Sequence, residues 1–254
     1  MKHVIGCMAV LAGLGLLAGN WTHETTMWIG GTCRAADAGG ASPASPSAVK
    51  EPLAGKDYPA GAYELPKPQF IGTRKDIRER FLRPPRVGPL LRPAMPLACR
   101  NLAAGKTVTS SDSEPFIGEL KLVTDGDKEA MDGSFVELGP GKQWVQIDLG
   151  QPAAIHVIHF WHFHADGRVY RDVVVQVADD ADFIENVRTL FNNDYDNSSG
   201  LGIGKDLQYV DNHEGEIVRA GGLKARYVRL YSNGNTADDR NHYIEVEVWG
   251  LPSK

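Results

Sequence analysis

The chain has 254 residues, a formal net charge of -5 at pH 7, 42% hydrophobic residues and 23% charged residues. This composition is ordinary for a soluble globular protein, and the acidic balance argues against nucleic acid as a partner. Of the three cysteines, Cys7 and Cys33 fall in an expected leader. The exported chain then keeps Cys99 alone, which excludes an internal disulfide and requires that stability come from burial.

The start of the chain has the pattern of an export signal. Lys2 precedes an apolar stretch over residues 4–18, which is too short to span a bilayer comfortably. Small residues permit cleavage after Ala35 or Ala36, and an earlier cut is an alternative. An uncleaved membrane anchor is the rival interpretation, but polar residues interrupt the segment. We therefore expect a signal peptide over residues 1–35, a secreted, periplasmic or cell-surface protein, and no stable membrane insertion after cleavage.

Residues 36–59 consist mainly of alanine, glycine, serine and proline. Large apolar side chains are almost absent from this stretch, so it cannot bury enough surface to offset its conformational entropy. We expect a flexible linker there.

Residues 60–97 form a Pro/Arg-rich extension. One short helix is predicted in it, capped by Thr73, with Ile77 and Phe81 on one face, and ending at Pro84. Acidic residues are interleaved with the basic ones, so we interpret the extension as a solvated basic surface and not as a nucleic-acid-binding arm. We expect this extension to lie over a neighbouring protein surface.

Between residues 98 and 252, apolar runs of strand length alternate with turn signals. In the clearest run Val145, Ile147 and Leu149 point one way and their neighbours the other, which is typical of a half-buried strand. The next apolar run follows after a turn, without room for a crossover helix, and this favours antiparallel pairing. We predict one all-β domain, a β-sandwich of about eight strands. The expected strands lie near residues 108, 120–123, 144–149, 155–163, 173–178, 209, 217–219, 227–231 and 244–249, with a single helical turn at 182–187.

Five motifs in this domain occur in the order found in the discoidin family, the coagulation factor V/VIII type C domains. They are NLAAGK at 101–106, VTDGD at 123–127, WVQIDLG at 144–150, ARYVRL at 225–230 and IEVEVWG at 244–250. The chain resembles this galactose-binding-like family and its kin, the family 32 carbohydrate-binding modules. The resemblance implies an eight-stranded antiparallel jelly-roll β-sandwich with its termini at one end, ligand-binding loops at the other, and no catalytic activity.

Members of the family bind sugars, membrane phospholipids or protein partners, and two departures bear on that choice. Many animal members join their ends by a disulfide, whereas Cys99 has no cysteine near Gly250 to pair with. The hydrophobic loop tips of lipid-binding members are not evident in this sequence. Both departures favour the bacterial sugar-binding branch.

Two acidic loops are candidates for cation binding. The resemblance implies a structural Ca²⁺ held by Asp125, the Asp127 carbonyl and Glu245, and calcium takes six to eight oxygen ligands. Ala130 stands where the family has a threonine ligand, and a plain acidic turn is the alternative. The second loop, residues 192–200, is interpreted as a turn, with a cation or a hydroxyl-rich ligand as the alternative.

The segment that ends the second long apolar run is rich in histidine and aromatic residues. We predict ligand binding by Trp161, His162, His164, Asp166 and Arg168, with an aromatic ring stacked on a sugar face and polar groups bonded to its hydroxyls. His162 and His164 share a strand face and would suit zinc, but no third ligand is identifiable. The plain alternative places the aromatic rings in the core and the histidines on the surface.

For catalysis, the sequence contains no G-x-S-x-G, H-E-x-x-H, C-x-x-C or Walker pattern. We therefore expect a protein that is not an enzyme. The prediction is an exported carbohydrate-binding module whose partner is a sugar or a cell-surface glycan. The alternative is a cell-surface structural or protein-interaction module that docks through its basic extension.

Overall fold

The computed structural model describes residues 57–70 and 74–253. The expected signal peptide 1–35, most of the expected linker 36–59 and the predicted helix cap Thr73 lie outside the described residues. Within the described part of the chain, no helix is long and apolar enough to cross a membrane.

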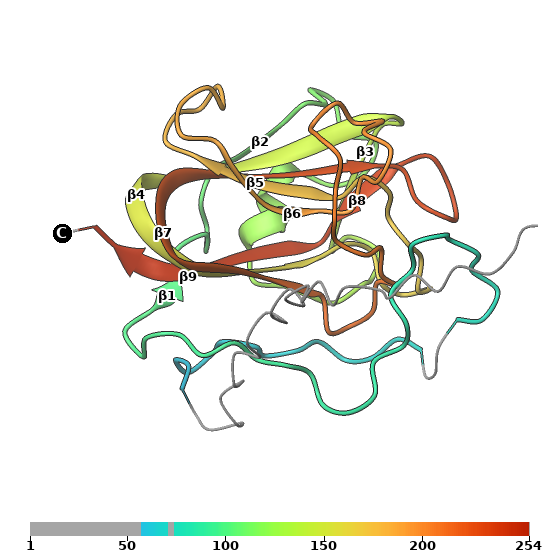
Figure 1. Cartoon of the computed structure of the whole chain (residues 1–254), viewed down its shortest axis with the longest axis horizontal. Helices are drawn as coiled ribbons and strands as arrows, with labels where there is room; N and C mark the ends of the chain where they lie inside the picture. Colours follow the sequence, from blue (N-terminus) through green and yellow to red (C-terminus); the bar gives the residue numbers. More distant parts are fainter. Residues whose placement is uncertain (1–56, 71–73, 254) are drawn as a thin grey trace, which may run out of the picture. The chain divides into compact units, whose positions relative to one another are not determined.

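The regular structure of the described residues is nine strands and one short 3-10 helix. The strands are β1 (Arg100–Asn101), β2 (Val108–Ser110), β3 (Val136–Leu138), β4 (Lys142–Trp161), β5 (Val174–Ala178), β6 (Arg188–Asn192), β7 (Glu216–Asn233), β8 (Asn241–Tyr243) and β9 (Glu245–Pro252), and the helix is η1 (Leu120–Thr124). The main sheet has the order β1-β9-β4-β7-β5-β6 with β2 on β4, and β3 pairs with β8. All these pairs are antiparallel. The prediction of an antiparallel all-β domain is confirmed (Figure 1).

The long strands β4 and β7 bend together, which gives the domain two layers. In the middle of β4, Gly150 has a φ of 86°, and the register with β7 shifts between Asp148 and Ala153. Before the bend β4 lies between β2 and β7, and after it between β9 and β7. On β7, Gly222 also has a φ of 86°, and a Cβ there would lie 3.2 Å from the His156 ring. The two strands curve beside the C-terminus from one layer into the other (Figure 1), as in a jelly-roll sandwich.

Apolar side chains from both layers fill the space between them. Val145 and Ile147 of β4 are fully buried, as their alternation predicts, and they share one cluster with Val175 of β5 and Val248 of β9. Each such side chain contributes roughly 1.5–3 kcal/mol by leaving water. This core stabilises a domain whose Cys99 is a free thiol.

The bend places both ends of β4 at one end of the sandwich, because the two halves of the strand lie in facing layers. The loops at that end touch one another. Lys142 Nζ donates to the Ser199 carbonyl at 2.6 Å, and Arg168 pairs with Asp238 at 3.0 Å. The pairing of β1 with the last strand lies beside the bend. The domain's termini and its clustered loops are therefore at opposite ends, as the resemblance implies.

The described residues 57–70 and 74–98 include side chains that pack on the outer face of the layer that contains β9. Tyr63 and Met95 pack with Val157 of β4 and Trp249 of β9 in an apolar cluster separate from the main core. The Tyr63 hydroxyl donates to the Pro93 carbonyl at 2.8 Å. The extension is therefore attached to its own domain through apolar contacts and not only through its charges.

The helix predicted within the extension is wrong. None of the described residues 74–84 is helical. The Arg83 N–H donates to the Gln208 carbonyl at 2.7 Å, and the Gln208 N–H donates to the Phe81 carbonyl at 3.1 Å. The backbone here thus bonds to another part of the chain instead of forming a helix. The strand expected near Tyr209 is also wrong, because only an isolated bridge between Leu82 and Gln208 is present there.

Two further predicted elements are wrong, and four strands were not predicted. Residues 120–124 form η1 instead of a strand, with the Leu122 N–H bonded to the Glu119 carbonyl. Residues 182–187 make no helical turn, because the Asp180 carboxylate accepts the N–H groups of Ile184 and Glu185 and holds an open loop. The short strands β1, β3, β6 and β8 have no marked alternation of apolar residues.

Candidate functional site

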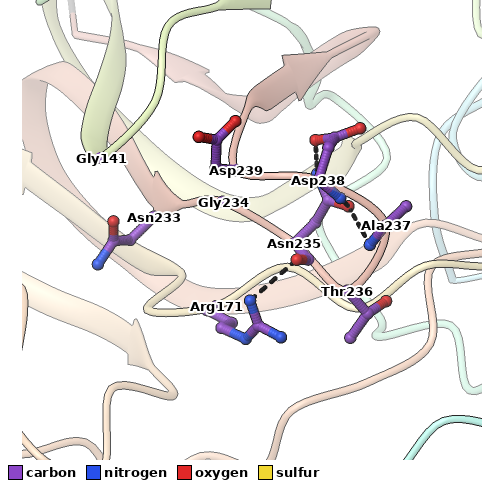
Figure 2. Close-up of a pocket in the computed structure, with 9 residues that line it drawn as sticks. All are labelled: Gly141, Arg171, Asn233, Gly234, Asn235, Thr236, Ala237, Asp238 and Asp239. Carbon is purple, nitrogen blue, oxygen red and sulfur yellow. Dashed lines mark hydrogen bonds between the residues drawn. The ribbon is translucent and has the colours of Figure 1, made fainter.

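A small polar pocket lies at the end of the sandwich where the loops meet. Its volume is about 330 Å³, within the range of small-molecule sites. The loop between β7 and β8 supplies most of the lining, as Figure 2 shows. The lining residues are Gly141, Arg171, Asn233, Gly234, Asn235, Thr236, Ala237, Asp238 and Asp239.

The loop around the pocket is fixed by one buried side chain, Asn235. Its Oδ1 accepts the N–H groups of Ala237 and Asp238, at 2.7 and 3.1 Å, and its Nδ2 donates to the Arg240 carbonyl at 2.9 Å. From the neighbouring loop, Arg171 donates to the Asn235 carbonyl at 2.9 Å (Figure 2). The pocket is therefore preformed, which reduces the entropy lost on binding.

The pocket offers donors and acceptors for a ligand with hydroxyl groups. The Arg171 guanidinium lies on one side and also donates to Glu79 at 3.1 Å. Asn233 Nδ2 donates to Asp172 at 2.8 Å, which directs its amide. The exposed Asp239 carboxylate is bonded to none of the residues drawn in Figure 2. A cationic donor, an amide and a carboxylate acceptor thus line one pocket.

An exposed aromatic ring stands near the same turn. Phe116 is 60% exposed, and its Cε2 atom lies 3.6 Å from where a Cβ of Gly139 would be. Asn241 holds this turn by donating to the carbonyls of Gly139 and Gly141, at 2.8 and 2.9 Å. The Arg240 guanidinium lies over the Phe116 ring, 4.2 Å from its centroid. Phe116 is an exposed aromatic surface beside this turn that could contact a ligand extending out of the pocket.

Three of the five residues predicted to bind ligand are in the interior. Trp161, His162 and His164 are each 0% exposed. Trp161 Nε1 donates to the His213 carbonyl at 3.0 Å, and His162 stacks on Tyr170 with ring centroids 4.2 Å apart. The prediction has to be corrected for these three, because a ring without exposed surface cannot stack on a sugar.

The histidines do not form a zinc site in the described structure. His164 Nε2 is 3.0 Å from the Lys128 carbonyl, and burial lowers the pKa of His164, which keeps the ring neutral. Among the described residues, His162 and His164 are not part of any cluster of three metal-binding side chains. Their position fits a role in packing between the sheet and the covering segments.

Asp166 and Arg168, the other two predicted residues, form an ion pair that supports the pocket. Arg168 donates to both Asp166 oxygens, at 2.9 and 2.6 Å, and to Asp238 at 3.0 Å. Asp238 in turn lines the pocket. The predicted segment therefore ends at the site, and it positions a lining residue instead of lining the site itself.

The expected calcium ligands lie close together but differ in environment. Asp125 and Asp127 are exposed, and the Asp127 N–H donates to Asp125 at 2.9 Å. Glu245 is 0% exposed, its Oε2 accepts the Gly126 N–H at 3.0 Å, and its Oε1 has no hydrogen-bond partner among the described residues. Burial raises the pKa of Glu245 to about 9, and the nearby Glu247 and Asp125 add to the effect. A buried carboxylate oxygen without a partner is a feature that a bound cation would explain.

Ala130, at the position of the family's threonine ligand, is buried beside Phe135, Trp161 and Ile244. It offers no side-chain oxygen. Any ion at this turn would depend on Glu245, on Asp125 and on backbone carbonyls.

The second acidic loop brings three carboxylates together. Ligand atoms of Asp172, Asp194 and Asp196 all lie within 4.8 Å of one another. Asp194 accepts the N–H groups of Ser198 and Ser199, at 3.1 and 2.9 Å. The loop's own donors thus bond to the carboxylate, as the turn interpretation predicts. Burial raises the pKa of Asp172, and the neighbouring carboxylates add to the effect.

Comparison with known proteins identifies similar structures but no family model. No family model matches the chain, and no curated protein matches it significantly. Similar solved structures include a family 89 glycoside hydrolase from Clostridium perfringens, with 20% identity, 60% of this chain and 15% of that chain covered, and a TM-score of 0.46. A chitosan-binding module of a Paenibacillus sp. IK-5 chitosanase/glucanase has 20% identity, with 59% of this chain and 99% of that chain covered, and a TM-score of 0.44. A family 32 carbohydrate-binding module from Clostridium perfringens, in complex with GlcNAc-α-1,4-galactose, has 16% identity, with 59% of this chain and 94% of that chain covered, and a TM-score of 0.45.

The chain thus spans about 15% of the length of the hydrolase. The assignment of the fold rests on the strand pairing described above, and the ligand is inferred from the chemistry of the pocket.

The residues that line the pocket were missed by sequence reasoning. The stretch from Asn233 to Asp239 contains asparagine, glycine and aspartate, which is a signal for a turn. That signal was present in the sequence. What the sequence did not show is that Arg171, more than 60 positions earlier, bonds to this loop.

Proposed function

We propose that this protein is a non-catalytic carbohydrate-binding module whose ligand site is the loop-end pocket. The observation that carries the proposal is that Arg171, Asn233 and Asp239 all line one preformed polar pocket. Sugar hydroxyls both donate and accept hydrogen bonds, so a cationic donor, an amide and a carboxylate can all be used. In a polar pocket, such groups would fix the orientation of the ligand.

The exposed ring of Phe116 supports the same function. The C–H face of a sugar ring packs well on an aromatic surface, and Phe116 is open to solvent beside the turn at Gly139. A sugar held in the pocket by Asp239 could extend towards this ring. We expect Phe116 to contribute affinity, and the pocket residues to decide which hydroxyl pattern is accepted.

The same proposal includes a structural calcium ion at the turn of Asp125. Asp125, the Asp127 carbonyl and Glu245 would hold it, and the unpartnered Oε1 of the buried Glu245 supports this choice. The ion would supply positive charge only. It would join the early loop to β9, the strand that carries Glu245, and so stabilise the fold.

A glycan array with the full chain tests the carbohydrate proposal. Any glycan that binds is then titrated against Asp239→Asn, which removes a pocket acceptor, and against Asp132→Asn, an exposed control outside the pocket. We expect about tenfold or greater loss for Asp239→Asn, since hydrogen bonds to charged groups are worth about 1.5–3 kcal/mol, and no change for the control. Folded protein that binds no glycan above background would rule the proposal out.

A protein-docking function is the second candidate, because the extension exposes apolar side chains. Val87 is 98% exposed and Leu97 69% exposed. Scattered exposed apolar residues are common, so this evidence is weaker than the pocket. Replacing both residues with serine separates the two functions. If the extension docks a protein, the double variant should no longer bind a defined cell-surface protein partner and should still bind glycan. If the protein binds only glycan, the double variant should behave like wild type.

A further inference from the structure

A second and larger cavity lies between the extension and the segment that leads into β7. Its volume is about 1120 Å³, and its walls are formed by residues between 68 and 93 and by residues 209–219. We call this cavity the basic groove. It shares no lining residue with the loop-end pocket, so the two can be altered independently.

Two ion pairs join the walls of the basic groove. Arg83 of the extension donates to both oxygens of Glu216, at 3.0 and 2.8 Å, and Arg86 pairs with Glu214. Glu214 and Glu216 are the two carboxylates among the lining residues, which include six lysines and arginines. Both carboxylates are therefore already neutralised, and the groove keeps an excess of positive charge.

Three of these basic side chains have no carboxylate partner. Lys75 and Arg78 on the extension and Arg219 on β7 are exposed, and none of them forms an ion pair with a described residue. They come from both walls. On a chain with a net charge of -5, such a local concentration of unpaired positive charge attracts anionic ligands.

Apolar side chains lie between the basic ones. Ile77, Leu82 and Leu90 contribute to the same lining. Arginine binds carboxylate and sulfate groups through two parallel hydrogen bonds, while aliphatic side chains can pack on the C–H faces of sugar rings. We propose that the basic groove binds an acidic polysaccharide, whose carboxylate or sulfate groups pair with Lys75, Arg78 and Arg219.

The choice among polyanions rests on the proposed carbohydrate-binding function and on the composition of the groove. An amphiphile with one anionic headgroup would need one cluster of basic residues, whereas positive charges are found on both walls. Single-stranded nucleic acid is favoured by exposed aromatic platforms. Of the described lining residues only Phe70 and Tyr209 carry a benzene ring, and Tyr209 is 7% exposed.

Binding of defined oligomers to the full chain tests this inference. The probes are an oligogalacturonate, which carries carboxylates, a heparin-derived oligosaccharide, which carries sulfates, a neutral dextran oligomer, and oligo-dT as another polyanion. Affinity is measured by titration calorimetry at low and high salt. The variants are Arg78→Gln/Arg219→Gln in the groove, Arg100→Gln as an exposed control on β1, and Asp239→Asn in the loop-end pocket.

We expect at least one acidic oligosaccharide to bind more tightly than dextran and oligo-dT, with affinity that falls as salt rises. The double variant should weaken it by about a hundredfold, since each charge-assisted contact is worth about tenfold. Arg100→Gln should leave it unchanged, and a loss for Asp239→Asn as large as for the double variant would place the binding in the loop-end pocket and overturn the proposal. Equal binding of dextran, preference for oligo-dT, or equal losses in the groove and control variants would overturn the proposal. The carboxylate and sulfate probes distinguish the two ligand chemistries.

Discussion

Replacing Arg83 with methionine tests whether the extension is held by a buried ion pair. The two hydrogen bonds from Arg83 end on Glu216, whose side chain is 10% exposed. Removal of one partner of a buried pair typically destabilises a protein by about 3–5 kcal/mol, because the other charge stays uncompensated. Since 42% of the Arg83 side chain is exposed, solvent screening reduces this effect, and we expect a loss of roughly 2 kcal/mol.

The loss should depend on pH in a defined direction. Burial raises the pKa of Glu216 above its ordinary value of 4.5, although the hydrogen bond from Arg83 opposes this. A carboxyl group whose pKa is higher in the folded state destabilises that state as pH rises above the unfolded value, and has no such effect below it. Without Arg83 the pKa should rise further. The difference between wild type and Arg83→Met should therefore be small below about pH 4.5 and grow towards neutral pH.

Urea unfolding at several pH values measures both effects. The double variant Arg83→Met/Glu216→Gln is the matched control, because it removes the buried charge together with its partner and should recover most of the stability at neutral pH. A loss below about 0.5 kcal/mol, the range of ordinary surface substitutions, that is also independent of pH would refute the reasoning. The extension would then not be held by this pair.

Three shorter predictions concern the calcium site, the bend and the buried tryptophan. Glu245→Gln should abolish the calcium-dependent rise in Tm, which for wild type corresponds to about 2.7 kcal/mol at a hundredfold excess over Kd; if a chelator leaves the wild-type melting curve unchanged, no ion is bound. Gly222→Ala should destabilise by about 1–3 kcal/mol in urea unfolding, because a side chain there meets both a positive φ and the His156 ring, and an unchanged midpoint would contradict the bend geometry. Trp161→Phe removes the hydrogen bond to the His213 carbonyl and should lower stability without changing glycan affinity. Weaker glycan binding at unchanged stability would restore the ligand-binding role predicted from the sequence.

The first half of β4 could be predicted because its side chains alternate, but the turn expected before residues 155–163 is wrong, because residues 142–161 form one bent strand. Val145 and Ile147 are buried on the core side, and this periodicity is visible without knowledge of the partner strands. The apolar run at 120–123 was wrongly predicted to be a strand. It is four residues long, and periodicity cannot separate a strand from a helical turn over so short a run. The chain forms η1 there, with the Leu122 N–H bonded to the Glu119 carbonyl, and Val123 is buried without strand pairing.

The candidate site was predicted less well, because burial near a strand end depends on distant parts of the chain. The sequence predicts that the Trp161 ring stacks on a sugar. In the structure it contacts the turn at His213 and the Lys128 ammonium group, whose nitrogen is 5.1 Å from the centroid of the Trp161 ring. Asp166 and Arg168 lie nearer to the pocket, through the contact with Asp238. The sequence indicated the end of the domain where the loop-end pocket lies, and it missed which side chains reach solvent there.

The bent pair of β4 and β7 also has a consequence for how the protein folds. Lys142 is paired with Asn233 and Phe160 with Glu216, so each rung of this ladder closes a chain segment of about 55 to 90 residues. Closing long segments costs entropy before any contact is gained, and domains rich in such contacts fold in about milliseconds to seconds. The described residues 57–70 and 74–98 pack on Val157 of β4 and Trp249 of β9 and pair with Glu216 of β7, so they can complete these contacts only after the three strands have formed. The extension should therefore be the last part of the chain to gain protection from hydrogen exchange during refolding.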